Sequence, residues 1–462
     1  MKIILINPYQ VSRYSQPPVG LAVIAGVLEK NGYQVSIIDG NALKIEPKEI
    51  SSYIIDASIV LLTAMTPTIN ITAKIAQEIK QVRPDIQIIL GGVHATLLPE
   101  DTLSSIHEID IIVRGEGEET ILELLSALQR KAVLNNISGI AFRSGDKIIN
   151  TNTRLRNINL DSLPFLPYHL LPVGKYRPHP PHGRALPFAA IVTSRGCPYN
   201  CAYCSKPVFG NKFRAQSSER VVEEVSYYKK RFGIKEVAFY DDVFTLDKKR
   251  AFAIAEGMIE KGLKLFWTCE TRANLVDREL LLKMRQAGCY SVSYGIESSS
   301  QEILNAINKD ITPEKVEEAI HLTREAGLQA TGYFMVGCPG ETPQTIRKSI
   351  DFAKHLKLDY AQFAITTPFP GTELYRRYLE GKGNKIPWEN FIYEGTGGKV
   401  TPVFENEALS RKDLQYWSKK AYRDFYLRPS YIWQRIRQIK SFGDLRITFS
   451  GFTMLMRSIT SH

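Results

Sequence analysis

Three cysteines stand close together near the middle of the chain. Cys197, Cys201 and Cys204 follow one another in a CxxxCxxC spacing, directly after the apolar run Phe188–Thr193. That run is typical of a strand, and the Gly, Pro and Asn residues around the cysteines indicate a loop. Three thiolates this close can face one metal centre. A cubane iron–sulfur cluster normally takes four cysteines, so three would leave one iron with an open position for chemistry.

Two other interpretations of the cysteine loop fit less well. A structural zinc site would need a fourth Cys or His nearby, and the loop contains none. A disulfide would leave one thiol without a partner. We therefore expect a [4Fe-4S] cluster with one iron open to a ligand.

The segment from Ser194 to Cys204 resembles the signature of the radical S-adenosylmethionine (SAM) enzymes. This resemblance implies that Cys197, Cys201 and Cys204 are the iron ligands, and that the amino and carboxylate groups of SAM bind the open iron. It also implies that an electron from the cluster splits SAM into a 5′-deoxyadenosyl radical. Tyr203 takes the aromatic position whose neighbourhood packs against adenine.

The elements that position this loop alternate between strands and helices over residues 187–390, as in the partial barrel of the same family. We expect strands at Phe188–Thr193, Glu236–Tyr240, Leu265–Cys269, Tyr290–Tyr294, Ala330–Val336 and Tyr360–Ile365. The active sites of such barrels lie at the carboxyl ends of the strands, so polar residues there are candidates for contacts with SAM.

Acidic residues and one arginine follow these strands. By resemblance, Asp241 or Asp242 replaces the Gly-Gly-Glu that often binds the SAM ammonium group. Glu270 would bind ribose hydroxyls and Arg272 a carboxylate, for which arginine is well suited. Two further candidates are Glu297 and the Gly-rich turn at Gly337. A salt bridge is the alternative for any single acid, but several in register with the cysteine loop favour a cofactor site.

Residues 1–154 also alternate between strands and helices, which predicts a parallel sheet covered on both faces. We expect strands at Lys2–Asn7, Val35–Asp39, Ile59–Thr63, Ile86–Leu90 and Ile109–Val113, and a hairpin within Ile137–Arg154. Ligands bind such doubly wound sheets beyond the carboxyl ends of the strands. No GxGxxG follows the first strand, so a dinucleotide is not favoured.

The loops at these carboxyl ends resemble the cobalamin-binding domain that precedes many radical SAM enzymes. Glycines there would let the backbone approach a flat ligand. The implied cobalamin contacts are Pro18, Thr66, Gly91, Gly92, His94, Gly115 and Glu116. The DxHxxG motif that supplies an axial histidine is absent, so we expect His94 to line the pocket rather than bind cobalt. The alternative is an α/β domain that binds nothing.

Residues 155–186 lack a clear period and are rich in Pro, Leu and His. They are interpreted as a linker, an irregular surface segment that could cover the substrate cavity. Its histidines, His169, His179 and His182, are not expected to form a metal site.

At 462 residues the chain should form two or three domains. Neither a signal peptide nor an apolar run long enough to span a bilayer is recognisable, so we expect a cytoplasmic protein. The other three cysteines, Cys269, Cys289 and Cys338, are expected to be buried free thiols.

Residues 391–462 form a basic, aromatic-rich tail with a helical pattern over Arg411–Arg437. Residues 411–462 contain eleven Lys or Arg and three Asp, so +8 of the net charge of +11 lies there. The tail could pack on the barrel, lie on an anionic membrane surface or bind nucleic acid. We rank packing first, peripheral membrane contact second and nucleic acid last.

The resemblance implies a cobalamin-dependent radical SAM enzyme that methylates an unactivated carbon of a small-molecule or lipid substrate. A flavodoxin- or ferredoxin-like protein would supply electrons. The runner-up is a radical cyclase or oxidase similar to the anaerobic porphyrin ester cyclase, and a non-catalytic iron–sulfur sensor is a further alternative. A methylthio-transferring enzyme is disfavoured, because no cysteine precedes Cys197.

Overall fold

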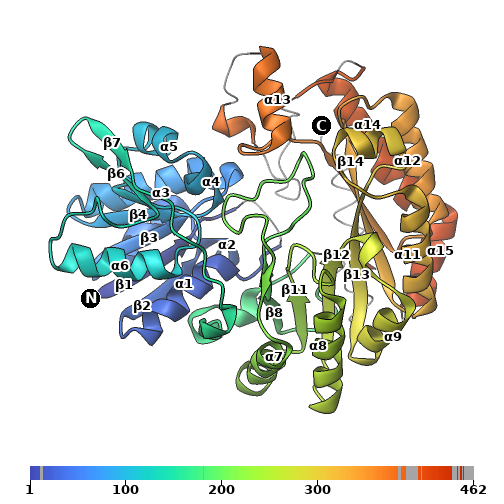
Figure 1. Cartoon of the computed structure of the whole chain (residues 1–462), viewed down its shortest axis with the longest axis horizontal. Helices are drawn as coiled ribbons and strands as arrows, with labels where there is room; N and C mark the ends of the chain where they lie inside the picture. The colour runs from blue at the N-terminus through green and yellow to red at the C-terminus, as the bar shows by residue number, and fades with distance from the viewer. Residues whose placement is uncertain are drawn as a thin grey trace.

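Two α/β units lie side by side in the computed structural model (Figure 1). The structure describes residues 1–10, 14–179, 182–382, 387–391, 404–406, 408–439, 445, 448, 449 and 451. The first unit is built on a seven-stranded sheet and the second on a six-stranded parallel sheet. This confirms the predicted combination of a doubly wound domain and a partial barrel.

The first sheet has the strand order β2-β1-β3-β4-β5-β6-β7. Separate apolar clusters cover its two faces, as the near-continuous apolar strands require. Its strands are β1 (Lys2–Asn7), β2 (Gln34–Asp39), β3 (Ile59–Thr63), β4 (Gln87–Gly91), β5 (Ile111–Val113), β6 (Ile140–Ser144) and β7 (Lys147–Asn150). Its helices are α1 (Val19–Lys30), α2 (Gly40–Leu43), α3 (Ile69–Val82), α4 (Val93–Leu97), α5 (Pro99–Ser105) and α6 (Glu118–Gln129), with the short 3-10 helices η1 (Pro47–Tyr53) and η2 (Thr66–Thr68).

Strands β1 to β5 are parallel, and the predicted hairpin β6–β7 adds two antiparallel strands at one edge. Strand β5 is shorter than expected and begins at Ile111. The backbone N–H of Asp110 still bonds to the carbonyl of Ile88, but the Asp110 carboxylate caps Ile88 N–H and pairs with Lys80. The ladder between β4 and β5 therefore begins at the pair Ile89–Ile111, two residues later than predicted.

The second sheet is entirely parallel and has the order β15-β14-β13-β12-β11-β8. Its strands are β8 (Phe188–Ile191), β11 (Glu236–Phe239), β12 (Phe266–Thr271), β13 (Cys289–Glu297), β14 (Gln329–Val336) and β15 (Tyr360–Ile365). The helices are α7 (Ser218–Phe232), α8 (Lys248–Glu260), α9 (Arg278–Gln286), α10 (Gln301–Ala306), α11 (Pro313–Glu325), α12 (Pro343–His355) and α13 (Glu373–Lys382). The first strand ends at Ile191, before the predicted Thr193.

The segment 155–186 is irregular, as predicted, and its described residues contain only short 3-10 helices, but it is not confined to the surface. Tyr168 and Tyr176 are fully buried and His182 is 2% exposed. The Tyr168 hydroxyl donates to the carbonyl of Ala190 in β8, and the Tyr176 hydroxyl donates to Asp39 Oδ2 at the end of β2. These two tyrosines therefore attach the segment to both units. A sequence pattern cannot reveal such contacts, because the partners lie far away along the chain.

The basic tail packs on the barrel, as ranked first. Helix α14 (Arg411–Tyr426) lies against β15 and α12, and α15 (Pro429–Gln438) follows it. Ser418, Tyr426 and Tyr431 bond to backbone groups of the β15 region. The sequence of the tail ends in an apolar stretch, residues 449–456, of which only 449 and 451 are among the described residues.

The carboxyl ends of the strands in the first sheet face the barrel. Helices α2 and α4, which follow β2 and β4, lie on that side (Figure 1). In the described part of the chain, no helix has the length and apolarity needed to cross a membrane.

Candidate active site

The three cysteines lie on the loop between β8 and α7, drawn in green between the two units in Figure 1. A two-residue antiparallel ladder closes its base, with β9 (Ser194–Arg195) paired to β10 (Arg214–Ala215). Gly196 has φ +87°, and a Cβ there would stand 2.3 Å from the carbonyl oxygen of Lys212. Only glycine therefore fits next to Cys197.

All three thiols are free; Cys197 and Cys201 are half-buried and Cys204 is exposed. Burial, then Asp242 and the two neighbouring thiols, raises the pKa of Cys204 to about 11. Burial also raises the pKa of Cys197, opposed in part by Lys206. The thiols thus lie within electrostatic reach of one another, and a metal centre would bind them as thiolates.

Among the described residues, no three His, Cys, Asp or Glu side chains surround a single-ion position. A cubane does not require such convergence, because each thiolate binds a different iron. The donor set, three soft thiols on a glycine-shaped loop, suits an iron–sulfur cluster.

Tyr203 is held in a buried network at the end of β13. Its hydroxyl donates to Glu297 Oε1 at 2.7 Å, and Lys309 Nζ donates to that same oxygen at 2.8 Å and to the Tyr203 hydroxyl at 3.0 Å. Glu297 has φ +66°, a left-handed conformation that is uncommon outside glycine. The two predicted site residues Tyr203 and Glu297 are therefore brought together, with Lys309 added.

Arg272, which we predicted to bind a carboxylate, is almost fully buried beneath the cysteine loop. Its Nη1 donates to Cys201 Sγ at 3.5 Å, its Nη2 donates to the carbonyl of Asp310 at 3.0 Å, and its guanidinium stacks on the Tyr199 ring at 3.7 Å. The structure therefore places Arg272 against a predicted cluster ligand.

The structure distinguishes the two aspartates after β11. Asp241 is 1% exposed and accepts hydrogen bonds from Thr193 N–H, Thr193 Oγ1 and Ser194 Oγ. Its oxygens are occupied by the start of the cysteine loop. Asp242 is exposed as a residue, but partial desolvation of its carboxyl group, followed by the charge of Asp241, raises its pKa, while Lys206 and the backbone N–H of Gly196 oppose the shift. Of the two aspartates, Asp242 is therefore the one that is accessible to solvent.

Glu270 and Gly337 lie at the ends of β12 and β14. Tyr333 donates to Glu270 Oε1 at 3.0 Å, and burial raises the pKa of Glu270. A Cβ on Gly337 would stand 2.5 Å from Leu414 Cδ2. The backbone of Gly337 therefore packs closely against α14. Its N–H donates to the buried carboxylate of Glu341.

In the first unit, His94 and Thr66 lie side by side beyond β4 and β3. Nδ1 of His94 is 3.2 Å from Thr66 Oγ1, and its ring packs edge-on against Trp388 at 4.8 Å. His94 is fully buried, which lowers its pKa to about 4, and its Nε2 has no hydrogen-bond partner among the described residues.

The other predicted cobalamin contacts take different positions. Gly92 (φ +96°) approaches the backbone of Ala64, whereas a Cβ on Gly115 (φ +74°) would meet nothing within 4 Å. Glu116 pairs with Arg195 and Arg214 of the cysteine-loop base. Pro18 precedes α1 and Gly91 ends β4. The open space beside Gly115 and the orphaned His94 Nε2 fit a ligand at this edge.

His182, in the predicted linker, lies in the lumen of the barrel, where no functional role was predicted for it. Its Nδ1 bonds to Thr268 Oγ1 at 2.7 Å, and its ring packs edge-on to Tyr240 at 5.5 Å. Burial lowers its pKa well below the ordinary value, so the ring is neutral. Its Nε2 has no partner among the described residues, nor have three buried hydroxyls of β13 and β14, those of Ser291, Ser293 and Thr331.

These hydroxyls lie inside the barrel, because the alternate residues Val292, Tyr294 and Phe334 belong to the core between sheet and helices. A polar lumen with unpaired groups suits a polar ligand or water. No sequence pattern pointed to His182 or Lys309, because their contacts are made with residues of other elements, Thr268 for the first and Tyr203 and Glu297 for the second.

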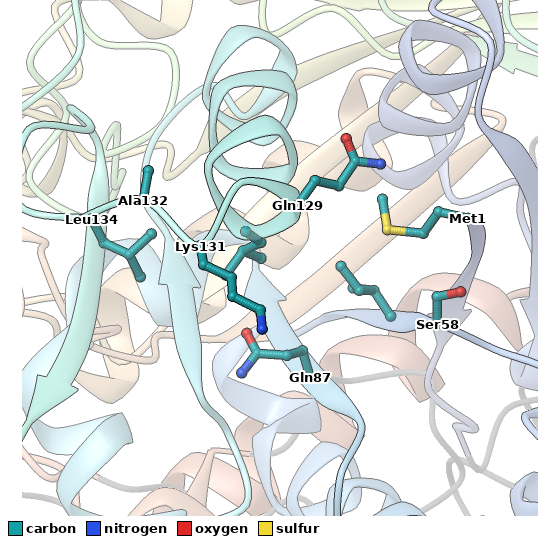
Figure 2. Close-up of a pocket in the computed structure, with 9 residues that line it drawn as sticks. Met1, Ser58, Gln87, Gln129, Lys131, Ala132 and Leu134 are labelled. Atoms are coloured by element: carbon teal, nitrogen blue, oxygen red, sulfur yellow. The ribbon is translucent and has the colours of Figure 1, made fainter.

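A shallow pocket of about 470 Å³ lies elsewhere. Ser58, Ile59 and Gln87 line it at the amino edge of the first sheet, together with Lys131 and neighbours at the end of α6 (Figure 2). Cofactors of doubly wound sheets bind at the opposite, carboxyl edge, so this pocket is separate from the candidate site.

The chain is similar to known proteins over nearly its whole length. Residues 191–353 match the radical SAM superfamily and residues 10–125 the B12 binding domain. It is 37% identical over 438 residues to an uncharacterized methyltransferase of Pyrococcus horikoshii, covering 93% of each chain. It is 30% identical over 447 residues to the anaerobic magnesium-protoporphyrin IX monomethyl ester cyclase of Rubrivivax gelatinosus, covering 94% of this chain and 78% of the cyclase.

A solved structure shares the fold. The radical SAM methyltransferase TsrM from Kitasatospora setae, with cobalamin and a [4Fe-4S] cluster bound, superposes with a TM-score of 0.69 at 20% identity, covering 82% of this chain and 75% of TsrM.

Proposed function

Because the chain belongs to the cobalamin-dependent radical SAM enzymes, which use a [4Fe-4S] cluster, SAM and cobalamin, we propose that it methylates an unactivated carbon of a small-molecule or lipid substrate. When bound, the cluster would provide the electron for reductive cleavage of SAM, and cobalamin would provide the methyl carrier. One observation carries the proposal: the loop with three free thiols is ion-paired to the carboxyl edge of the B12-binding unit.

We assign Cys197, Cys201 and Cys204 as the cluster ligands. Asp242 and Glu270 are the acids left to bind the ammonium and ribose groups of SAM, since Asp241 is occupied by Thr193 and Ser194. Tyr203, Glu297 and Arg272 position the loop beside the cluster.

On the cobalamin side, the backbone at Gly115 and the Thr66–His94 pair would line the cofactor pocket, with Pro18 and Gly91–Gly92 at its edge. His94 is held by Thr66 and Trp388, which supports a lining role for it. The neutral His182 and the unpaired lumen hydroxyls would bind polar groups of the substrate and exclude loose water.

The test uses anaerobically purified protein reconstituted with iron, sulfide and hydroxocobalamin. The absorption spectrum should report both cofactors, and reduction in the presence of SAM should yield 5′-deoxyadenosine. Cys201→Ala should abolish this cleavage and lower bound iron, whereas the matched control Cys289→Ala, a buried thiol, should retain both. Cleavage that survives in Cys201→Ala would refute the assigned site.

A second candidate is a cobalamin-linked cyclase or oxidase, favoured by the 30% identity with the Rubrivivax cyclase. Mass spectrometry of the product separates the two. An added methyl mass supports methyl transfer, and loss of hydrogens or gain of oxygen supports the cyclase.

We also propose that an acidic flavodoxin- or ferredoxin-like donor delivers the electron, since the net charge of +11 favours an acidic partner. Reduction of the cluster by flavodoxin should slow as salt is raised. A rate independent of salt would argue against this partner.

Peripheral membrane contact is proposed for helix α15. Ile432, Trp433 and Ile436 are about half exposed on one face, and Arg437 lies over the Trp433 ring. Apolar side chains flanked by cations suit an anionic lipid surface. The protein should sediment with anionic liposomes, and Trp433→Ser/Ile436→Ser should release it; no sedimentation of the wild type would remove the idea.

A further inference from the structure

A buried group of two glutamates and two arginines joins the two units at the base of the cysteine loop. Arg195 Nη1 lies 3.1 Å from Glu116 Oε2 and Arg195 Nη2 lies 2.6 Å from Glu118 Oε1. Arg214 Nη1 donates to Glu116 Oε2 at 3.0 Å. All four side chains are 11% exposed or less. Equal numbers of opposite charges make the group neutral and able to persist in a buried place.

We propose that these residues, here called the interdomain clamp, are positioning residues that couple the cobalamin site to the cluster site. The inference rests on the proposed function, because it takes Cys197 as a cluster ligand. The clamp makes binding of cobalamin and of SAM mutually favourable, so that the enzyme binds SAM tightly only when cobalamin is seated.

On the cobalamin side, the first clamp residue, Glu116, directly follows Gly115, which has open space beside it at the carboxyl edge of the first sheet. Gly115 has φ +74°, its N–H donates to Thr96 Oγ1, and the position of its missing side chain is empty. The next residue, Glu116, turns its carboxylate to the two arginines. A ligand against Gly115 therefore restrains the backbone that carries Glu116.

On the cluster side, the clamp ends two residues from a predicted ligand. Arg195 precedes Gly196, whose backbone is pressed against Lys212, and then Cys197. Arg195 and Arg214 are ladder partners in β9 and β10. The Arg214 guanidinium also donates to the carbonyls of Asn157 and Phe209. A shift of Glu116 thus reaches both strands that close the loop.

Ordinary packing between the units would hold them together without linking the two sites. Chains of packed and ion-paired groups can carry coupling between two sites, and Gly115, Glu116, Arg195, Gly196 and Cys197 form such a chain here. Such coupling is reciprocal: cobalamin must change the affinity for SAM by the same factor as SAM changes the affinity for cobalamin.

The experiment measures SAM affinity by calorimetry, using full-length protein with the oxidised cluster so that SAM binds without being cleaved. Titrations are made with and without saturating hydroxocobalamin. In the wild type we expect cobalamin to tighten SAM binding by about tenfold, within the usual range for coupled sites. The reverse titration should give the same factor.

A matched pair of substitutions on α6 isolates the clamp. Glu118→Gln removes one ion pair of Arg195 and should lower the cobalamin effect to about threefold, with SAM affinity in the absence of cobalamin unchanged. Glu119→Gln, at the adjacent and largely exposed residue that faces Arg154, should leave the full effect. Glu116→Gln, which breaks the pairs with both arginines, should reduce the effect to below about twofold.

Equal effects in Glu118→Gln and Glu119→Gln, or no cobalamin effect in the wild type, overturn the clamp. If Glu116→Gln does not fold, the Glu118→Gln and Glu119→Gln pair decides alone. Failure of the wild type to bind SAM at all would instead refute the proposed function, so the two failures are distinguishable.

Discussion

Arg272, at the end of β12, contacts the cysteine loop directly. Its guanidinium reaches Cys201 Sγ, the carbonyl of Asp310 and the face of Tyr199. A donor to a ligand sulfur orients that ligand and tunes the bound metal. At the residue scale, some polar side chains around the loop are thus available to bind a cofactor, whereas others, such as Arg272, hold the loop itself.

Replacing Arg272 should weaken the cluster site without unfolding the barrel. Arg272→Gln loses the bond to Cys201 and the stacking on Tyr199, so we expect SAM cleavage to fall roughly 10- to 100-fold. The rate of 5′-deoxyadenosine formation measures this fall, and iron content and the EPR signal of the reduced cluster report the state of the cluster. Arg278→Gln, at the start of α9, serves as control; equal losses in both variants would contradict a specific role for Arg272.

Glu341 should make stability depend on pH. Burial raises its pKa from 4.5 to about 7, even though its carboxylate accepts the N–H groups of Gly337 and Cys338. The folded state therefore binds this proton more tightly than the unfolded state, so the carboxyl lowers stability as pH rises from about 4.5 through 7.

Glu341→Gln mimics the protonated form and can still accept both N–H groups. It should match the wild type at pH 5 and exceed it at pH 8, by up to about 3 kcal/mol. Thermal unfolding of the two proteins across this range measures the gap. A gap that stays constant with pH would refute the assignment.

At the scale of elements, the cysteine loop depends on one glycine more than on its flanking strands. Gly196 needs both a positive φ and empty space beside Lys212. The two-residue ladder β9–β10 is too short to hold the loop alone, so the loop geometry follows from this close backbone approach.

Gly196→Ala should therefore lose the cluster while the barrel remains folded. We expect bound iron to fall below about a quarter of the wild-type value, because strain in the left-handed conformation and a backbone clash together cost several kcal/mol. Gly233→Ala is the matched control: it has φ +64° at the end of α7, with open space around it. Iron content and circular dichroism distinguish the two outcomes, and full iron content in Gly196→Ala would refute the idea.

For the whole molecule, the segment 155–186 determines how the two units meet. Tyr176 reaches Asp39 at the end of β2, and that carboxylate also accepts Asn7 Nδ2 and the N–H of Ala42. Tyr168 bonds to both backbone groups of Ala190 in β8. Through these two buried tyrosines, the segment is attached to both units rather than being a loose connection.

Tyr176→Phe should destabilise the protein by roughly 1–3 kcal/mol, because buried Asp39 loses a donor. The change should also speed proteolysis within residues 155–186. Tyr53→Phe, at a half-exposed residue, should change neither. Denaturant unfolding and limited proteolysis check both expectations. An unchanged free energy of unfolding in Tyr176→Phe would show that the Tyr176–Asp39 hydrogen bond does not stabilise the protein.

The sequence alone determined what is local in the chain. The cysteine spacing identified the cluster chemistry, and alternating apolar periods identified both sheets and the hairpin, because spacing and period act over a few residues. Only the tertiary structure decided which polar groups are free. In the folded chain, Asp241 accepts a hydrogen bond from Thr193 and Arg272 donates one to Cys201. His182 is buried in the barrel, and Glu116 forms an ion pair with Arg195. Each of these outcomes depends on partners far away in the chain, which no local pattern encodes.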